Sequence, residues 1–392
     1  MTFVEVFLEY KFVILFYLAI ILFIYLKRKK FEFQAKFIAL YRMKFGLGWI
    51  EKVGRRHSEL IKILGYCGIG VGYAGMAFIV FMLGKGLWDM AFVPNAPPVV
   101  SPVLPGVPIP GSPIFVPFWY GIIALFIVVV IHEFSHGVVA RAHDVKVMNT
   151  GIVFFGPIVG AFVEPDEKQV DKQPDHVKYS IFAAGPFSNV LTAALVLLIA
   201  ALVMSPLTDA VAKPVGVEFT YVEPGFPADI AGLQTGVTYD FVNNYSTNDL
   251  SSFESALRDV QINETVYIGN SDSNYTVVTT SREENPKKAI IGVNVRTKFT
   301  NEDKWWLKII LWTNGLLSWI FMLSLGLGLA NLLPLGPVDG GRMIKESLER
   351  IWGEKVGKQA WYKITVLVIV ILLILVFVPI ARAILGPFFG AA

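Results

Sequence analysis

The long apolar stretches of this chain constrain its fold more than any other feature. Six of them are long enough to cross about 30 Å of hydrocarbon as helices. They cover approximately residues 4–26, 62–84, 117–141, 179–205, 306–330 and 361–386. Of the 392 residues, 54% are hydrophobic and 17% are charged, whereas soluble domains are about one quarter charged. The sequence therefore predicts a polytopic α-helical membrane protein with about six transmembrane helices.

The positions of the basic residues predict how these helices are oriented. Lys27 to Lys30 follow the first apolar stretch, and no small-residue cleavage site is present, so we interpret this stretch as a retained signal anchor. Further Lys and Arg residues continue to Arg56, and this segment is expected to be cytoplasmic. Residues 86–116 contain no Lys or Arg, are rich in proline and are expected to form an outer loop. This alternation places the N-terminus outside.

Residues 31–60, within the basic segment, mix basic and apolar positions. They fit either an interfacial helix that lies on anionic headgroups or a solvated cytoplasmic linker. The single cysteine, Cys67, excludes an intrachain disulfide and a cysteine-based metal site. The net charge of +3 gives no indication of a nucleic acid partner, and we expect none.

The segment from Lys213 to about Lys304 differs from the rest of the chain because it is polar and rich in turns. Its β-branched, alternating runs predict a small β domain, and Ser251–Val260 predicts an amphipathic helix. The orientation of the spans places this domain outside the cytoplasm. Three N-glycosylation sequons agree with that location, although such short motifs also arise by chance. They begin at Asn244, Asn263 and Asn274.

A His-Glu-Phe-Ser-His sequence lies near the end of the third apolar stretch. On a helix, His132 and His136 are one turn apart and face the same way, so both imidazoles can bind one Zn²⁺. Glu133 then lies beside the metal and can act as a general base. Ionisable groups inside a membrane helix are costly and are functional by default. The sequence therefore predicts an intramembrane zinc site in the cytoplasmic half of the bilayer.

A catalytic zinc needs a third protein ligand, and Asp339 is the best candidate. It follows the fifth span after a stretch rich in Pro and Gly, which breaks the helix near membrane depth. The alternative for Asp339 is a cytoplasmic residue that caps the next helix. His57 and His176 are expected in cytoplasmic loops, and His143 at the membrane edge.

These residues resemble the site-2 protease family of intramembrane zinc metalloproteases. The resemblance rests on the His-Glu-x-x-His motif and on an Asn-x-x-Pro-x-x-x-x-Asp-Gly pattern that begins at Asn331. It implies that His132, His136 and Asp339 bind zinc and that Glu133 is the catalytic base. For Asn331 it favours a role in holding the substrate backbone or the oxyanion, over a plain hydrogen bond to a neighbouring helix. For Asn189 these two roles stay open.

Further stretches carry the same resemblance. Residues 151–163, with Gly156 and Gly160, resemble a membrane-embedded β-hairpin that receives substrate as an added strand. Residues 184–189 resemble the motif that opens the family's central core helix. Residues 222–233 resemble part of a PDZ domain, although Gly236-Val237 stands where the family has Gly-Asp.

We accordingly divide the chain into five parts. Residues 1–60 are the signal anchor and basic cytoplasmic segment, and residues 61–116 are the second transmembrane helix and Pro-rich outer loop. Residues 117–212 and 305–392 are the two parts of the metalloprotease membrane core, the latter including the C-terminal transmembrane helix. Residues 213–304 are an inserted extracytoplasmic PDZ-like α+β domain.

The expected activity is that of a zinc metalloendopeptidase of the plasma membrane. It would hydrolyse peptide bonds within or near transmembrane segments of membrane protein substrates, as in regulated intramembrane proteolysis. The expected partners are these substrates and the lipid bilayer; no oligomeric state is predicted. Two other classes compete: a metal-ion transporter or channel, and an inactive protein that binds partners through its PDZ-like domain. The transporter hypothesis does not explain Glu133, and the inactive-protein hypothesis does not explain the complete set of four residues.

Overall fold

The computed structural model describes residues 3–34, 38–93, 96–112, 114–155, 158–282 and 285–389. Parts of the predicted outer loop (Pro94, Asn95 and Pro113) and of the predicted hairpin (Gly156 and Pro157) lie outside these ranges. The chain forms two compact units. One unit contains the chain up to Leu198 together with Gly315–Phe388, and the other contains Ile199–Asn314.

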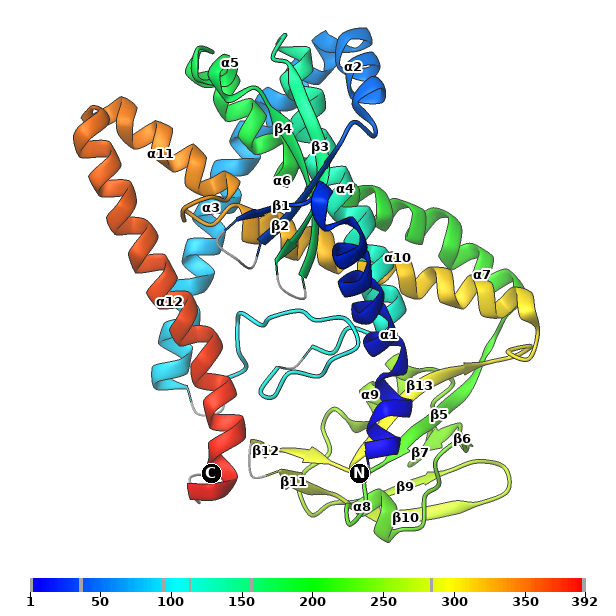
Figure 1. Cartoon of the computed structure of the whole chain (residues 1–392). Helices are drawn as coiled ribbons and strands as arrows, with labels where there is room; N and C mark the ends of the chain where they lie inside the picture. The colour runs from blue at the N-terminus through cyan, green and yellow to red at the C-terminus, as the bar shows by residue number, and fades with distance from the viewer. Residues whose placement is uncertain are drawn as a thin grey trace. The chain divides into compact units, whose positions relative to one another are not determined.

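Within the residues that the structure describes, six helices are long and apolar enough to cross a membrane, which confirms the predicted polytopic helical fold. Many of their large apolar side chains are exposed, as expected where lipid replaces water. Figure 1 shows them as the longest elements of the chain. They are α1 (Phe3–Lys27), α3 (Ser58–Phe92), α4 (Phe118–Ala142), α6 (Asp175–Ile199), α10 (Trp305–Asn331) and α12 (Glu354–Phe389). A π-helical turn, η2 (Ala200–Met204), and α7 (Ser205–Val211) prolong α6.

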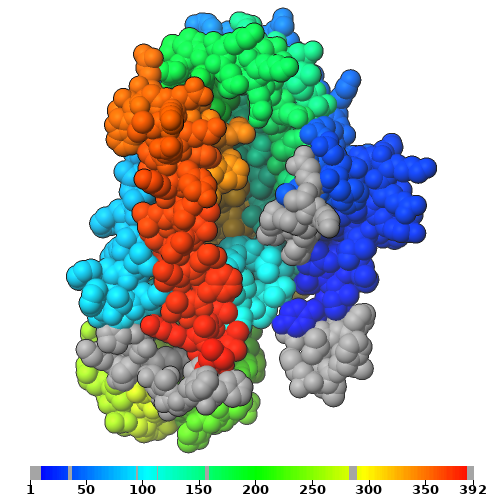
Figure 2. Space-filling model, turned by 60° about the vertical axis from the view of Figure 1, so that its left-hand side comes forward, coloured from blue at the N-terminus to red at the C-terminus, as the bar shows by residue number. Residues whose placement is uncertain are grey.

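Helix α12 packs along α3 within the first unit. Leu83 of α3 and Leu333 form an apolar cluster with Val368 and Leu375 of α12. Figure 2 shows α12, coloured orange to red, running along one face of the molecule beside α3, coloured cyan. The loop that follows α10 is held between these two helices.

A four-stranded antiparallel sheet lies beside α4 in the first unit. Its order is β1 (Glu32–Gln34), β2 (Ile38–Met43), β3 (Val147–Phe155) and β4 (Ile158–Pro165). The predicted hairpin is present as β3 and β4 and extends beyond residues 151–163. A Cβ on Gly151 would lie 2.3 Å from the Phe162 ring and 2.5 Å from the Tyr41 carbonyl oxygen, so only glycine fits there.

Both predictions for residues 31–60 were wrong for their first part, which forms β1 and β2 instead of a helix or linker. Strand β2 pairs with β3 from Ile38↔Phe155 to Met43↔Thr150, so its backbone groups are satisfied by a distant segment. Helix α2 (Leu47–Arg56) follows and packs against α4. A Cβ on Gly54 would lie 2.6 Å from Cβ of Arg141, which shows how closely α2 approaches α4.

The remaining helices of the first unit are short or lie between spans. They are α5 (Glu167–Asp171), which is capped by Asp166, and α11 (Asp339–Trp352). A short 3-10 turn, η1 (Arg28–Lys30), follows α1.

The second unit is rich in strands and has its own apolar core around Phe219, Tyr239 and Ile268. Its described strands form two larger sheets and one separate pair. Helix α9 (Leu250–Leu257) begins with an Asp249–Ser252 capping box, close to the predicted helix at 251–260. The strands are β5 (Pro214–Val222), β6 (Thr238–Tyr239), β7 (Phe241–Val242), β8 (Tyr245–Ser246), β9 (Thr265–Gly269), β10 (Asn274–Val278), β11 (Thr280–Arg282), β12 (Asn285–Ile290) and β13 (Val293–Phe299), with α8 (Pro227–Ile230) after β5. One sheet has the order β10-β9-β7-β8 and the other β13-β5-β6, while β11 pairs with β12.

Candidate metal centre

The His-Glu-Phe-Ser-His sequence lies on α4, as predicted, with both histidines buried. His132 is 3% exposed and His136 is 9% exposed, and their ring centroids are 5.0 Å apart. Glu133 points to a neighbouring side of the helix, where its Oε2 accepts a hydrogen bond from the backbone N–H of Val163 at 3.1 Å. The helix therefore presents two imidazoles in one direction and a carboxylate toward strand β4.

Asp339 meets the two histidines from the other end of the chain. It is the first residue of α11, and its Oδ2 lies 3.1 Å from Nε2 of His132 and 3.4 Å from Nε2 of His136. One donor atom from each of the three residues lies within 4.8 Å of the others. Among the described residues, no other group of three or more His, Cys, Asp or Glu side chains is placed to share a metal.

These three side chains fit a zinc ion chemically. Two imidazole nitrogens and one carboxylate oxygen form a donor set of a catalytic zinc site, which leaves a position open for water or substrate. Two other histidines that the sequence offers besides Asp339, His143 and His57, lie elsewhere. His143 contacts Tyr66 and lies 3.3 Å from the Ser180 hydroxyl, and His57 ends α2. The structure thus brings together the three residues that the sequence predicts as ligands.

The loop before Asp339 is folded so tightly that two glycines must follow it. A Cβ on Gly340 would lie 2.3 Å from the Leu332 carbonyl oxygen, and one on Gly341 would lie 2.2 Å from that of Leu335. Helix α12 holds this loop from outside. Nε1 of Trp361 donates to the Gly341 carbonyl at 2.9 Å, and the Gly336 N–H donates to the Thr365 hydroxyl at 3.1 Å.

Gly185 of α6 provides the space in which the two histidine rings lie. A Cβ at this position would be 2.4 Å from Nε2 of His136 and 2.5 Å from Nε2 of His132. Both distances are far below van der Waals contact, so a side chain here would displace the donor atoms. The sequence shows a Gly-Pro pair here, within the stretch that resembles the opening of the family's core helix. That pair marks a special backbone position, but its role became visible only from the fold.

Helix α6 also contacts the far side of both imidazole rings. Nδ1 of His136 lies 2.7 Å from the Ile181 carbonyl oxygen, and Nδ1 of His132 lies 3.2 Å from the Asn189 amide. Asn189 therefore forms a hydrogen bond to the neighbouring helix α4, and its partner there is the candidate ligand His132. Asn331, the last residue of α10, donates from its amide nitrogen to the Leu327 carbonyl of its own helix at 3.0 Å.

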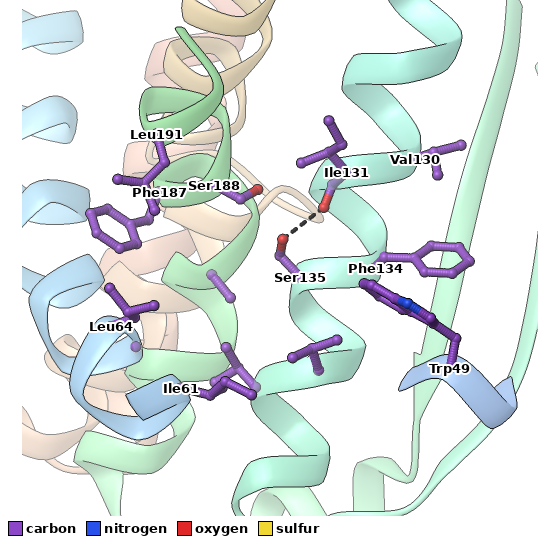
Figure 3. A pocket seen from close by; sticks show the side chains of 14 residues that line it. Trp49, Ile61, Leu64, Val130, Ile131, Phe134, Ser135, Phe187, Ser188 and Leu191 are labelled. Atoms are coloured by element: carbon purple, nitrogen blue, oxygen red, sulfur yellow. Dashed lines mark hydrogen bonds between the residues drawn. The ribbon is translucent and has the colours of Figure 1, made fainter. Parts of the chain in front are cut away.

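An apolar pocket of about 430 Å³ lies on another face of α4. Figure 3 shows Trp49, Ile61, Phe134, Ser135 and Ser188 among the side chains around it, which come from α2, α3, α4 and α6. Its two serine hydroxyls are already used within their own helices. Ser135 donates to the Ile131 carbonyl and Ser188 to the Gly185 carbonyl, both at 2.7 Å. The pocket therefore offers apolar contacts and little polar recognition.

Ion pairs hold the segments that extend beyond the spans. The Arg141 guanidinium donates to Glu51 of α2 at 2.9 Å, and this hydrogen bond lowers the pKa of the Glu51 carboxyl. At the end of β4, partial burial tends to raise the pKa of Glu164, but hydrogen bonds from Asn149 and Arg42 outweigh it and lower the pKa. These pairs tie α2 to α4 and β2 to β4.

The sequence comparisons agree with this geometry. Residues 120–376, well over half of the chain, match the model of peptidase family M50. The matched region contains the His pair, Glu133 and Asp339. The chain is also 28% identical over 315 residues to an uncharacterized protein of Methanocaldococcus jannaschii, in an alignment that covers 77% of this chain and 75% of that protein.

Proposed function

The chain belongs to peptidase family M50, and on this premise we propose that it is an intramembrane zinc metalloendopeptidase. It would hydrolyse peptide bonds within or near transmembrane segments of membrane protein substrates. The observation that carries the proposal is the cluster of His132, His136 and Asp339 on and beside membrane helices, with Glu133 next to it. A zinc ion bound by these three residues would polarise the scissile carbonyl and lower the pKa of an attacking water.

The chain's own residues supply the remaining steps. Glu133 would take the proton of the attacking water and deliver it to the leaving amine. Its hydrogen bond to the Val163 N–H keeps the carboxylate beside the cluster. Asn331 would stabilise the oxyanion, because an amide donor near the reacting carbonyl favours the charged transition state. In the present arrangement that amide donates to Leu327, so it would have to turn toward the substrate.

The edge of β4 is the proposed docking place for an unwound substrate. A helical substrate keeps its backbone groups paired, so it must open locally before attack. The Val163 N–H points away from β3 and toward Glu133, so a strand added at this edge would lie beside the catalytic base. Strand β2 already occupies the other side of β3, which leaves β4 as the edge next to α4.

The second unit is the proposed PDZ-like domain. In support, helix α9 and the segment Ile290–Val295 line a groove of about 700 Å³, as expected where an extended peptide lies between a helix and a strand. The distribution of Lys and Arg around the spans favours an extracytoplasmic location for this unit and for the N-terminus. There it would select substrates before they reach the cytoplasmic half of the plasma membrane.

The test of the function is a Glu133→Gln variant of the purified full-length protein in liposomes with a model transmembrane substrate. Loss of a general base is expected to slow cleavage by about 10²–10⁴-fold. Zinc content, measured by mass spectrometry, should be unchanged because the three donors remain. Cleavage at the wild-type rate would exclude the role of Glu133. Zinc flux across the same liposomes, with no cleavage by the wild type, would favour the transporter hypothesis.

A further inference from the structure

Asn189 is a buried polar residue for which the proposed reaction has no use. It lies on α6, and its side chain has no exposed surface. One end of its amide faces Nδ1 of His132 at 3.2 Å. The other end, Oδ1, has no hydrogen-bond partner within the described residues. An unpaired buried polar atom is costly, so asparagine at this position should contribute something that an apolar residue would not.

The neighbouring histidine shows what such a contact can do. Nδ1 of His136 faces the Ile181 carbonyl oxygen at 2.7 Å, and a carbonyl can only accept a hydrogen bond. Nδ1 of His136 therefore carries the proton, and Nε2 presents its lone pair to the cluster. The backbone of α6 thus holds His136 in the tautomer that can bind a metal.

His132 has an amide in the place of that carbonyl. A half rotation about the Cβ–Cγ bond exchanges the oxygen and nitrogen of an amide and leaves the outline of the side chain almost unchanged. With Nδ2 toward the ring, Nδ1 must accept, and the proton lies on Nε2, which faces Oδ2 of Asp339 at 3.1 Å. With Oδ1 toward the ring, Nδ1 donates and Nε2 is free to bind a metal. In the structure Nδ2 faces the ring and Oδ1 is the unpaired atom, so this is the first of the two arrangements.

We infer that Asn189 is the positioning residue of His132, whose amide oxygen accepts from Nδ1–H and thereby selects the tautomer with Nε2 as the metal donor. After a half rotation the amide Nδ2 donates to Nδ1 instead, which stabilises the tautomer whose Nε2–H donates to Asp339. Asn189 therefore stabilises His132 with and without metal, whereas Ile181 permits His136 only one tautomer. This inference rests on the proposed metal site.

The test is metal binding to the metal-free full-length protein in detergent, with Zn²⁺ or Co²⁺ as the probe. Asn189→Leu keeps the number and branching of the side-chain heavy atoms and removes both hydrogen-bonding groups. We expect it to weaken zinc binding by about 10–100-fold, the usual effect of losing a contact to a metal-bound histidine, and to change the visible spectrum of bound Co²⁺. Asn189→Asp keeps an acceptor and should bind zinc within a few-fold of the wild type.

Two controls separate positioning from a general structural effect. Ser188→Ala alters the adjacent residue of α6, whose hydroxyl donates to the Gly185 carbonyl, and should leave zinc affinity unchanged. Asn189→Ala is the second variant without a hydrogen-bonding group, and it replaces Asn189→Leu if that variant does not fold. Thermal unfolding of the metal-free proteins identifies which variants are folded.

Three results would overturn the inference. The first is wild-type zinc affinity and Co²⁺ spectrum in folded Asn189→Leu or Asn189→Ala. The second is an equal loss of affinity in the Leu and Asp variants, which would remove the role of the acceptor. The third is lost cleavage with unchanged zinc affinity, which would assign Asn189 to the substrate. A wild-type protein that binds no zinc would instead overturn the proposed function itself.

Discussion

Helix α4 presents two faces that differ in how strictly their surroundings fix each side chain. On the side of the candidate centre, His132 and His136 are held by Asp339, by contacts from α6 and by the empty space at Gly185. On the pocket side, Ile131, Phe134 and Ser135 line an apolar space, and the serine hydroxyl bonds only its own helix. The comparison teaches that one helix can combine a strictly positioned polar site with a tolerant apolar surface.

The strongest challenge to this contrast is the removal of a proposed ligand. Asp339→Ala should weaken zinc binding by more than about 100-fold. The loss of a contact to a metal ligand typically costs up to about 100-fold, and this substitution removes a donor atom itself. Cleavage of a transmembrane substrate should then be lost. Zinc content and titration calorimetry of the purified protein measure the effect. Tight zinc binding that survives the substitution would exclude Asp339 as the third ligand.

A second challenge adds one methyl group on the side of the centre. Gly185→Ala would place a Cβ within 2.5 Å of both Nε2 atoms, so the rings must move. We expect zinc affinity and cleavage to fall by about 10–100-fold, as for other disturbances around a metal ligand.

The matched control for Gly185 is Gly70→Ala in helix α3. A Cβ at Gly70 would meet nothing within 4 Å. This variant should be as active as the wild type and equally or slightly more stable, since alanine favours a helix by up to about 1 kcal/mol over glycine. Equal behaviour of the two alanine variants would show that the space at Gly185 is not required.

A smaller effect is expected for the ion pair between Arg141, near the end of α4, and Glu51 of α2. Arg141 is buried and Glu51 is half exposed, so Glu51→Gln should lower stability at pH 7 by about 1 kcal/mol, the upper range for such pairs. Because the pKa of Glu51 is lowered in the fold, its contribution is complete above the unfolded pKa of about 4.3 and is lost as pH falls through the folded value. Thermal unfolding of both proteins as a function of pH should therefore converge in acid. A constant difference down to the lowest pH would contradict this origin.

The smallest effect is expected on the pocket side. Ser135→Ala removes a hydroxyl that only donates to Ile131 of its own helix. Such a change should alter stability by less than about 0.5 kcal/mol and leave zinc affinity and cleavage within about two-fold. A loss comparable to that of Gly185→Ala would show that the pocket side belongs to the site.

The two faces also explain what could be predicted from the sequence. The spacing of His132 and His136 is a local helical relation, so it was readable without the fold. Asp339 was suggested by a broken helix, although only the fold shows its oxygen beside Nε2 of His132, 207 residues away. The spaces and contacts from α6, at Gly185 and Asn189, could not be predicted. They depend on how closely two helices approach, and apolar residues in a membrane helix carry little information about which side meets a neighbour.

The strands β1 and β2 could not be predicted for a related reason. Residues 32–43 are short and mixed in polarity. Strand β1 pairs with β2, and β2 in turn pairs with β3, which lies more than a hundred residues later. A short hairpin that depends on a distant strand to complete its sheet leaves only a weak local pattern. The long membrane helices satisfy their backbone groups locally. The sequence predicts α1, α4 and α10 within one residue of their observed bounds, and α3, α6 and α12 within eight residues.

The separation of Asp339 from the histidines has a consequence for the life of the chain before it is complete. A ribosome adds about 5–20 residues per second, so the 207 residues between His132 and Asp339 take about 10–40 s to synthesise. During this interval the nascent protein enters the bilayer with two of its three donors. Under the proposed function, the metal centre of a newly inserted copy would therefore stay incomplete until Asp339 is added, and cleavage would begin only near the end of translation.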